Sequence, residues 1–173
     1  MNILIRGGGD LASGVAVRLR RVGLRVVITE LPKPLAVRRL VSFSEAVYQE
    51  KTSVEDIKAR LVSSPELCNS VLEQGEIPVL VDPELRSLEI IRPTILIDAR
   101  MTKRAPQIRI DNAPLVIGLG PGFIAGENCH AAIETKRGHT LGRVIWMGKP
   151  QADTGVPEGV GDYYAERVLR AQT

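Results

Sequence analysis

The chain has 173 residues, of which 44% are hydrophobic, and this length suits one folded core better than two domains. Its 23 basic and 20 acidic residues give a formal net charge of +3, whereas aromatic residues make up only 3%. Because nucleic-acid binding usually combines a basic surface with stacking aromatics, we expect no nucleic-acid partner. No apolar run approaches the roughly 20 residues that span a bilayer, and two cysteines without a C-x-x-C pair fit a reducing compartment. We therefore expect a cytoplasmic protein without a membrane contact.

The first element is an apolar strand over residues 2–6 that leads into a glycine turn. Helix 11–22 follows and ends at Gly23, and a second strand over residues 26–30 ends at Glu30. This order of strand, glycine turn, helix, strand and acid is typical of a Rossmann-type nucleotide-binding half. The alternative is a glycine turn that serves packing alone.

The residues of this first glycine loop and its neighbours each have a predicted function. Gly7 permits the tight turn, and Gly9 lets backbone N–H groups approach a pyrophosphate. Ala12 keeps the helix close to the sheet, and Glu30 can accept hydrogen bonds from a ribose diol. We place Gly8 and Ser13 in the same predicted cofactor site.

Asp10 complicates a simple dinucleotide site. Its carboxylate can cap the free N–H groups at the start of the helix, where a pyrophosphate would otherwise bind. The same acid could instead hold Mg²⁺ against a phosphate. No Tyr-x-x-x-Lys or other hydride-transfer pattern is present, so we assign no catalytic residue.

The rest of the chain continues an α/β pattern. We expect weak helicity over residues 34–49, a helix from residue 52 or 53 to 62, and a short helix over 65–75. Apolar runs at 77–81, 94–97 and 115–118 predict buried strands, and residues 131–135 and 143–146 predict a β-hairpin. Residues 163–171 can form a last helix. The predicted fold is a Rossmann-like, mostly parallel sheet with flanking helices and a C-terminal β-hairpin, in one domain over 1–173 with a terminal extension from residue 150.

A second glycine loop contains Gly118, Gly120, Pro121 and Gly122 and directly follows a predicted strand. Because the carboxyl ends of parallel strands meet at one edge, the two glycine loops could face a shared ligand. The alternative is a tight turn. Arg100, with Lys103 and Arg104, could clamp phosphates on the same rim, or could belong to a solvated charged loop.

Cys129, His130 and His139 form the reactive Cys/His group of the sequence. We expect no metal site, because zinc needs three or four placed ligands and adjacent residues of a strand point to opposite faces. Cys129 is interpreted as a small buried thiol, with a sulfur carrier or soft ligand as the alternative.

Several of these segments together resemble the YqeB family. They are RGGGDLASG at 6–14, KPLAVRR at 33–39, DARM at 98–101, GLGPGF at 118–123, and the region from Cys129 to LGRV at 141–144. The resemblance implies an accessory protein of selenium-dependent molybdenum hydroxylases, related at the Rossmann level to the XdhC/CoxI maturation factors. Members often continue after a segment like 166–171 into a lipoyl-like β domain, so we expect a short form or a chain that ends at that boundary.

These observations predict a protein that binds a phosphate-bearing small molecule, either a nucleotide or a molybdopterin-type cofactor, and that serves a molybdenum hydroxylase. Two alternatives remain open, an NAD(P)-dependent oxidoreductase and a non-catalytic interaction domain. Glu30 would favour NAD over NADP, because a carboxylate repels a 2′-phosphate. The sequence also leaves open whether the chain forms a homo-oligomer.

Overall fold

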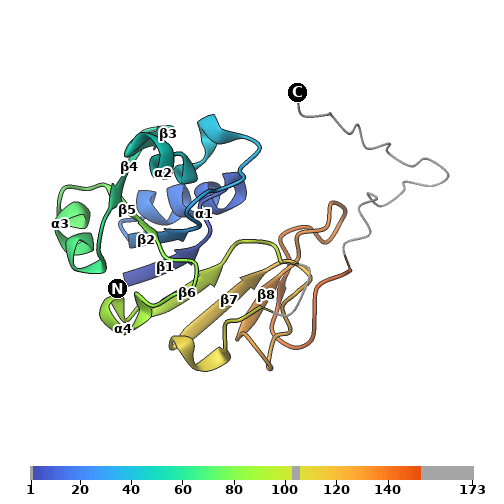
Figure 1. Cartoon of the computed structure of the whole chain (residues 1–173). Helices are drawn as coiled ribbons and strands as arrows, with labels where there is room; N and C mark the ends of the chain where they lie inside the picture. The colour runs from blue at the N-terminus through green and yellow to red at the C-terminus, as the bar shows by residue number, and fades with distance from the viewer. Residues whose placement is uncertain (1, 103–105, 153–173) are drawn as a thin grey trace.

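The computed structural model describes residues 2–102 and 106–152, and within them one nine-stranded sheet organises the chain. The strand order is β3-β4-β5-β2-β1-β6-β7-β8-β9 (Figure 1). The strands are β1 (Asn2–Arg6), β2 (Arg25–Glu30), β3 (Lys51–Val54), β4 (Ile57–Val62), β5 (Ile77–Val81), β6 (Ile95–Asp98), β7 (Leu115–Leu119), β8 (Ala131–Ile133) and β9 (Val144–Ile145). Only β3 and β9, at the two edges, pair antiparallel with their neighbours. The predicted α/β class with a Rossmann-like, mostly parallel sheet is confirmed.

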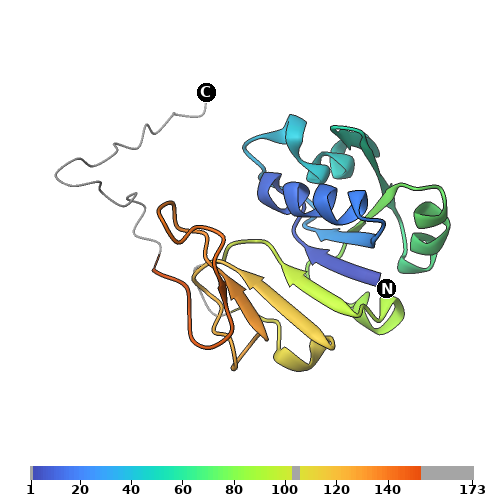
Figure 2. The ribbon, with the colours of Figure 1, turned by 180° about the vertical axis from the view of Figure 1, so that it is seen from behind.

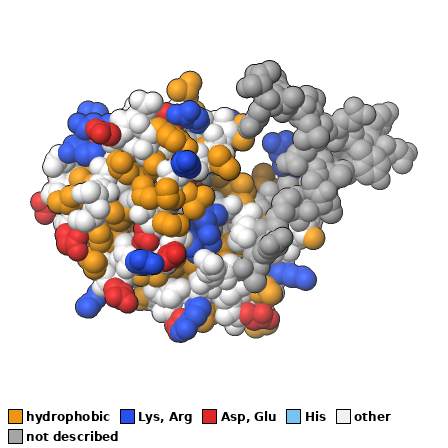
Figure 3. Space-filling model, viewed as in Figure 1, with side chains coloured by type: hydrophobic (Ala, Val, Ile, Leu, Met, Phe, Trp, Pro, Cys, Tyr) orange, Lys and Arg blue, Asp and Glu red, His pale blue; other side chains and the backbone are white. Residues whose placement is uncertain are grey.

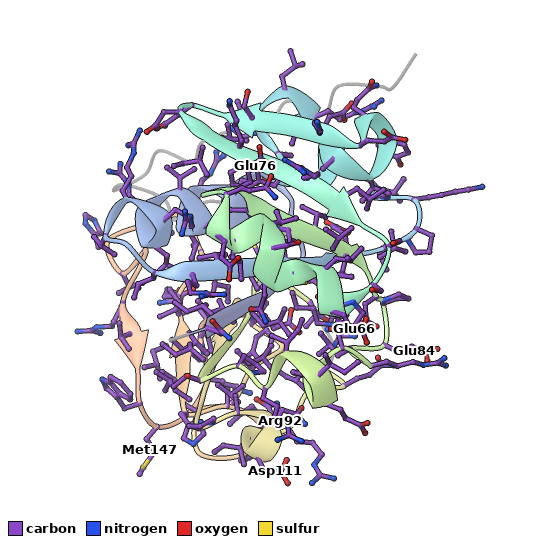
Figure 4. All side chains as sticks on the ribbon, turned by 90° about the vertical axis from the view of Figure 1, so that its left-hand side faces the viewer. Glu66, Glu76, Glu84, Arg92, Asp111 and Met147 are labelled. Atoms are coloured by element: carbon purple, nitrogen blue, oxygen red, sulfur yellow. The ribbon has the colours of Figure 1, made fainter. Side chains whose placement is uncertain are left out.

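Helices cover both faces of this sheet. Helices α1 (Asp10–Arg21) and α2 (Ala46–Gln49) lie on the face that Figure 2 presents. Helices α3 (Cys68–Glu73) and α4 (Leu88–Ile91) lie on the opposite face, so α1 and α4 flank the sheet on its two sides in Figure 4. Short 3₁₀ helices are η1 (Arg39–Val41), η2 (Phe43–Glu45), η3 (Pro65–Leu67) and η4 (Ile110–Asn112).

Alternate residues of the central strands fill a separate core on each face. Ile3, Ile5 and Ile28 pack with α1, whereas Leu4 and Val27 pack on the side of α3. This two-sided burial explains why the strands read as continuous apolar runs, which is the pattern of a parallel sheet.

The order in which the chain adds strands to the sheet reverses at β1. This topological switch point positions the candidate site. From β1 the chain first builds β2 on one side, and later returns to place β6 on the other side. Ligands of open α/β sheets bind outside the carboxyl ends of the strands at such a point. Here the ends of β1 and β6 are Arg6 and Asp98, which are register partners.

The helix predicted over residues 52–62 is wrong, because this segment forms the β3–β4 hairpin. Glu55 adopts a left-handed conformation at φ 54°, which breaks a helix and turns the chain back on itself. Strand β4 then pairs in parallel with β5 and buries Ala59 and Val62. Helical spacing and sheet pairing compete in this short segment, and the tertiary pairing with β5 decides between them.

Most of the other predicted elements agree with the structure. The strands over 2–6, 26–30, 77–81, 94–97 and 115–118, the helices near 11–22 and 65–75, and the C-terminal hairpin are confirmed with small shifts of boundary. Residues 34–49 are helical only in η1, η2 and α2. The helix predicted at 163–171 and most of the extension from residue 150 lie outside the described residues.

The described surface carries both charge signs. In Figure 3 acidic and basic side chains alternate on the lower part of the molecule, and hydrophobic side chains gather in the upper middle. Met147 is 89% exposed and points away from the sheet (Figure 4). Among the described helices, none has the length and hydropathy needed to span a bilayer.

Candidate functional site

The first glycine loop is tightly enclosed by its neighbours at Gly7 and Gly8. Gly7 has φ 94°, a left-handed conformation that favours glycine, and its N–H donates to the Thr29 carbonyl at 2.8 Å. A Cβ on Gly8 would lie 3.0 Å from the Ser44 nitrogen, because the Ser44 N–H donates to the Gly8 carbonyl at 2.8 Å. These two glycines are therefore required by packing, whatever the loop binds.

Ser13 and Ala12 support the loop from below. The Ser13 hydroxyl donates to the Gly8 carbonyl at 3.1 Å and accepts from the Phe43 N–H at 2.8 Å. Both Ser13 and Ala12 are buried in the core beneath the loop. They position the loop, and neither side chain is exposed to a ligand.

Glu30 ends β2 as predicted, and its carboxylate holds the glycine loop. One oxygen accepts from the Gly8 N–H at 2.7 Å, and the other accepts from the Leu31 N–H at 2.6 Å. Each carboxylate oxygen has a second lone pair, so a ribose hydroxyl could still be accepted. The contact that the structure contains is with the loop itself.

Gly9 and Asp10 stand at the start of α1, and Asp10 does not cap this helix as predicted. Gly9 is the N-cap of α1, and no side chain caps this helix end, so the predicted capping role of Asp10 is wrong. The Asp10 carboxylate forms an ion pair with Arg38 instead. A Cβ on Gly9 would meet no atom within 4 Å, and no side chain hydrogen-bonds the N–H groups at this helix end. Of the three loop glycines, Gly9 is the one that adjoins room for a ligand.

A buried charge cluster lies beside this loop, at the ends of β1 and β6. Asp98 is fully buried, and its carboxylate accepts from the Arg100 guanidinium at 2.9 and 2.7 Å. Arg6, which is 4% exposed, lies 3.8 Å from the same carboxylate and donates to the Pro83 carbonyl at 2.6 Å. Burial and the nearby Arg100 lower the pKa of Arg6, while Asp98 and Asp82 oppose this effect.

Arg100 is thus placed next to the glycine loop, as its assignment to the site requires. Its Cγ would lie 3.0 Å from a Cβ on Gly7, so the two residues are in close contact. Its charge is shared with Asp98, which limits its strength as an anion clamp. Arg6 and Asp98 were not identified as a pair from the sequence. The sequence indicated the pair only through one charged residue at the end of each of two apolar strands.

The second glycine loop lies on the other side of residues 99–102. A Cβ on Gly120 would lie 3.4 Å from the Met101 Cα, and the Gly122 N–H donates to the Thr102 carbonyl at 3.0 Å. Pro121 is half-buried in the turn between them. The two glycine loops share one edge of the sheet, with this segment between them. Lys103 and Arg104 lie outside the described residues.

Gly118 has a packing role that the sequence did not reveal. A Cβ there would lie 2.0 Å from the Phe123 Cγ, because the fully buried Phe123 ring packs directly on the strand backbone. The structure therefore explains Gly118 without a ligand. It is a contact glycine of the core rather than an exposed part of a cradle.

The Cys/His group also has structural contacts. Cys129 is fully buried, and desolvation raises the pKa of its thiol. The Nδ1 of His130 accepts from the Val116 N–H at 3.0 Å, which ties the chain to β7. Within residues 2–102 and 106–152, no three His, Cys, Asp or Glu side chains gather closely enough to hold a metal ion.

Glu134 is a buried carboxylate at the end of β8 that sequence reasoning did not assign to a site. It is 3% exposed, and its oxygens accept from the Lys136 and Gln151 N–H groups, each at 2.8 Å. These hydrogen bonds connect the loop after β8 with the chain after β9. In the sequence, Glu134 was marked only by its place in the region from Cys129 to residue 144 that resembles the YqeB family.

Comparison with known proteins found a relative of this chain by sequence. No protein-family model matches the chain, and no solved structure matches it. The chain is 45% identical over 169 residues to YqeB of Escherichia coli (strain K12), an uncharacterized protein, and the match covers 98% of this chain. The chain spans 31% of the length of that relative. Over the stretch that the two proteins share, this similarity supports the placement of the chain in the YqeB family.

Proposed function

We propose that the chain binds a phosphate-bearing nucleotide or molybdopterin-type cofactor at the first glycine loop, as an accessory protein in the maturation of a selenium-dependent molybdenum hydroxylase. The observation that carries the binding proposal is the N-terminus of α1, which no side chain caps and where a Cβ on Gly9 would meet no atom within 4 Å. A helix N-terminus presents unpaired N–H groups and a partial positive charge, so it suits a phosphate.

Two further features support a phosphate at this position. The loop lies at the topological switch point between β1 and β6, which is where open α/β sheets bind ligands. Arg100 adjoins Gly7 and adds positive charge beside the helix end. The role in molybdenum hydroxylase maturation rests on the family resemblance, and it extends to this chain as a proposal.

A non-catalytic interaction domain is the second candidate, and one observation favours it. Leu35, Val37 and Leu40 are 90%, 86% and 90% exposed, close together in the segment between β2 and η2. Adjacent exposed apolar side chains of this kind often mark a protein contact. The NAD(P)-dependent oxidoreductase remains a third alternative because Glu30 ends β2.

A ligand screen followed by one pair of variants tests the proposal. Thermal shifts with NAD, NADP, ATP, CTP and molybdopterin species, with and without Mg²⁺, identify the ligand. Gly9→Val should then weaken its binding at least about tenfold, because the side chain occupies the space in front of the N–H groups. The Tm should fall by no more than a few degrees, since a Cβ at Gly9 meets no neighbour and the remaining cost is that valine is a poorer N-cap residue than glycine.

Gly14→Val is the matched control, because Gly14 also has open space and lies in the same helix. It should leave the affinity unchanged. Equal affinity of wild type and Gly9→Val would refute the phosphate loop. A stabilising shift with NAD or NADP alone would favour the oxidoreductase, and no shift with any ligand would favour the interaction domain.

A further inference from the structure

A hollow of about 720 Å³ runs along the outer side of α1 and begins at Asp10, directly after the first glycine loop. One wall is α1 itself, with Leu11, Gly14, Val15 and Arg18. The other wall comes from the segment after β2 and from the β3–β4 hairpin, both of which lie beside α1 in Figure 2. Asp10, at the start of α1, belongs both to this lining and to the predicted cofactor site, whereas none of residues 7–9 or 118–122 lines the hollow. The hollow therefore adjoins the predicted cofactor site and extends away from it along α1.

Ion pairs lie near the two ends of the hollow. Asp10 pairs with Arg38 at the start of α1. At the other end Arg21 contacts the hairpin residues Glu55 and Asp56 at 2.5 and 2.7 Å. The acidic groups of the lining, Asp10 and Glu55, are therefore both compensated.

Arg18 differs from these groups because it has no carboxylate partner among the described residues. It lies two turns along α1 from Asp10 and is exposed at the wall of the hollow. Most of the remaining lining is apolar, with Leu11, Val15, Val41 and Val54 among its residues. One positive charge over an apolar floor is complementary to an anion with an apolar body.

Gly14 lines the hollow and is exposed. Glycine is the least favourable residue of a helix interior after proline, yet it occupies the middle of the lining wall. A Cβ at this position would meet no atom within 4 Å, so the fold does not need a glycine there. An occupant of the hollow that approaches the helix backbone would need one.

We propose that this hollow binds a small organic anion with a flat apolar body, which lies on Gly14 and places its anionic group at Arg18. The volume falls within the roughly 300 to 1,000 Å³ of typical ligand pockets. This site is additional to the nucleotide or cofactor site proposed above.

Two fluorescent probes of similar shape test the proposal. Anilinonaphthalene sulfonate carries the anion, and phenylnaphthylamine has the apolar body without it. The wild type should bind the sulfonate at one site and more tightly than the neutral probe. Arg18→Gln should weaken the sulfonate about three- to tenfold and leave the neutral probe unchanged. Lys58→Gln removes an exposed charge outside the hollow and should change neither probe.

Gly14→Leu tests the location. The leucine side chain should occupy the space over residue 14 and weaken both probes at least about tenfold, while the Tm stays the same or rises because leucine favours helix. Gly14→Ala gains most of the same helix propensity but adds only a methyl group, so it should weaken both probes by about two- to fivefold, less than Gly14→Leu does. If Gly14→Leu does not fold, the Arg18→Gln comparison still decides.

Retained sulfonate binding in a folded Gly14→Leu variant would overturn the proposal, as would equal losses of both probes in Arg18→Gln. The outcome is independent of the proposed function. Gly9→Val should lose the nucleotide and keep the sulfonate, whereas Gly14→Leu should do the reverse.

Discussion

Asp98 provides the most direct test of what holds the candidate site together. Its buried carboxylate faces two guanidinium groups, with Arg100 bound through two nitrogens and Arg6 at 3.8 Å. Asp98→Asn keeps the size of the side chain and removes its charge. The 4%-exposed Arg6 would then be a buried cation without its carboxylate partner.

The expected cost is large because removing one partner of a buried ion pair strands the other charge. Such changes typically cost about 3 to 5 kcal/mol, and the low exposure of both Arg6 and Asp98 places this pair in that class. For a chain of this length that corresponds to a fall in Tm of roughly 6 to 20 °C. Thermal unfolding followed by circular dichroism, with chemical denaturation as a second measure, gives the value.

Asp111→Asn is the matched control. Asp111 also binds an arginine two residues away through both oxygens, but Arg109 and Asp111 are 74% and 58% exposed. Solvent screens that pair, so the control should leave the Tm unchanged. If Asp98→Asn proves no more costly than Asp111→Asn, the buried cluster does not stabilise the ends of β1 and β6, and the reasoning from burial is refuted.

Four further predictions rest on the contacts and the burial of described residues. Gly118→Ala should destabilise the fold near the upper end of about 1 to 3 kcal/mol, because the new Cβ overlaps the Phe123 ring, and denaturant unfolding would reveal a wrong prediction as an unchanged midpoint. Glu30→Gln should weaken pyrophosphate and the intact nucleotide alike in calorimetric titration, because the carboxylate acts through the loop N–H; a loss confined to ribose-bearing ligands would restore its predicted ribose role. Burial raises the pKa of Cys68 to about 11 and also raises that of Cys129, so dithionitrobenzoate at pH 8 should react with neither thiol until the protein unfolds. Because the folded-state pKa of Cys68 lies above the unfolded value, its contribution to stability is present below about pH 8.5 and is lost as the pH rises toward 11, which denaturant midpoints across this range can check.

The strands and the first helix could be read from the sequence because their signals are local. The run at residues 2–6, the glycines after it and the acid at Glu30 each belong to one short segment whose backbone preference does not depend on distant residues. The parallel sheet followed from the same evidence, since strands that are apolar throughout must be buried on both faces.

The contacts inside the site could not be read in this way. Glu30 follows a strand in the position of a ribose acceptor, but only the approach of Gly8 shows that its carboxylate holds the loop. Gly118 looked like part of a ligand cradle, and its requirement comes from the Phe123 ring five residues later. Both contacts depend on side-chain directions that are set after the sheet has formed.

The sequence by itself determined that this chain is a Rossmann-like α/β protein with a glycine turn before its first helix, because hydrophobic period, glycine and chain order are sufficient for that inference. The tertiary structure alone decided that residues 52–62 form a hairpin, that Arg6 and Asp98 meet at the sheet edge, and that a hollow opens over Gly14. Each of these depends on strand register or on packing between segments far apart in the chain, and neither is encoded in the pattern of any single segment.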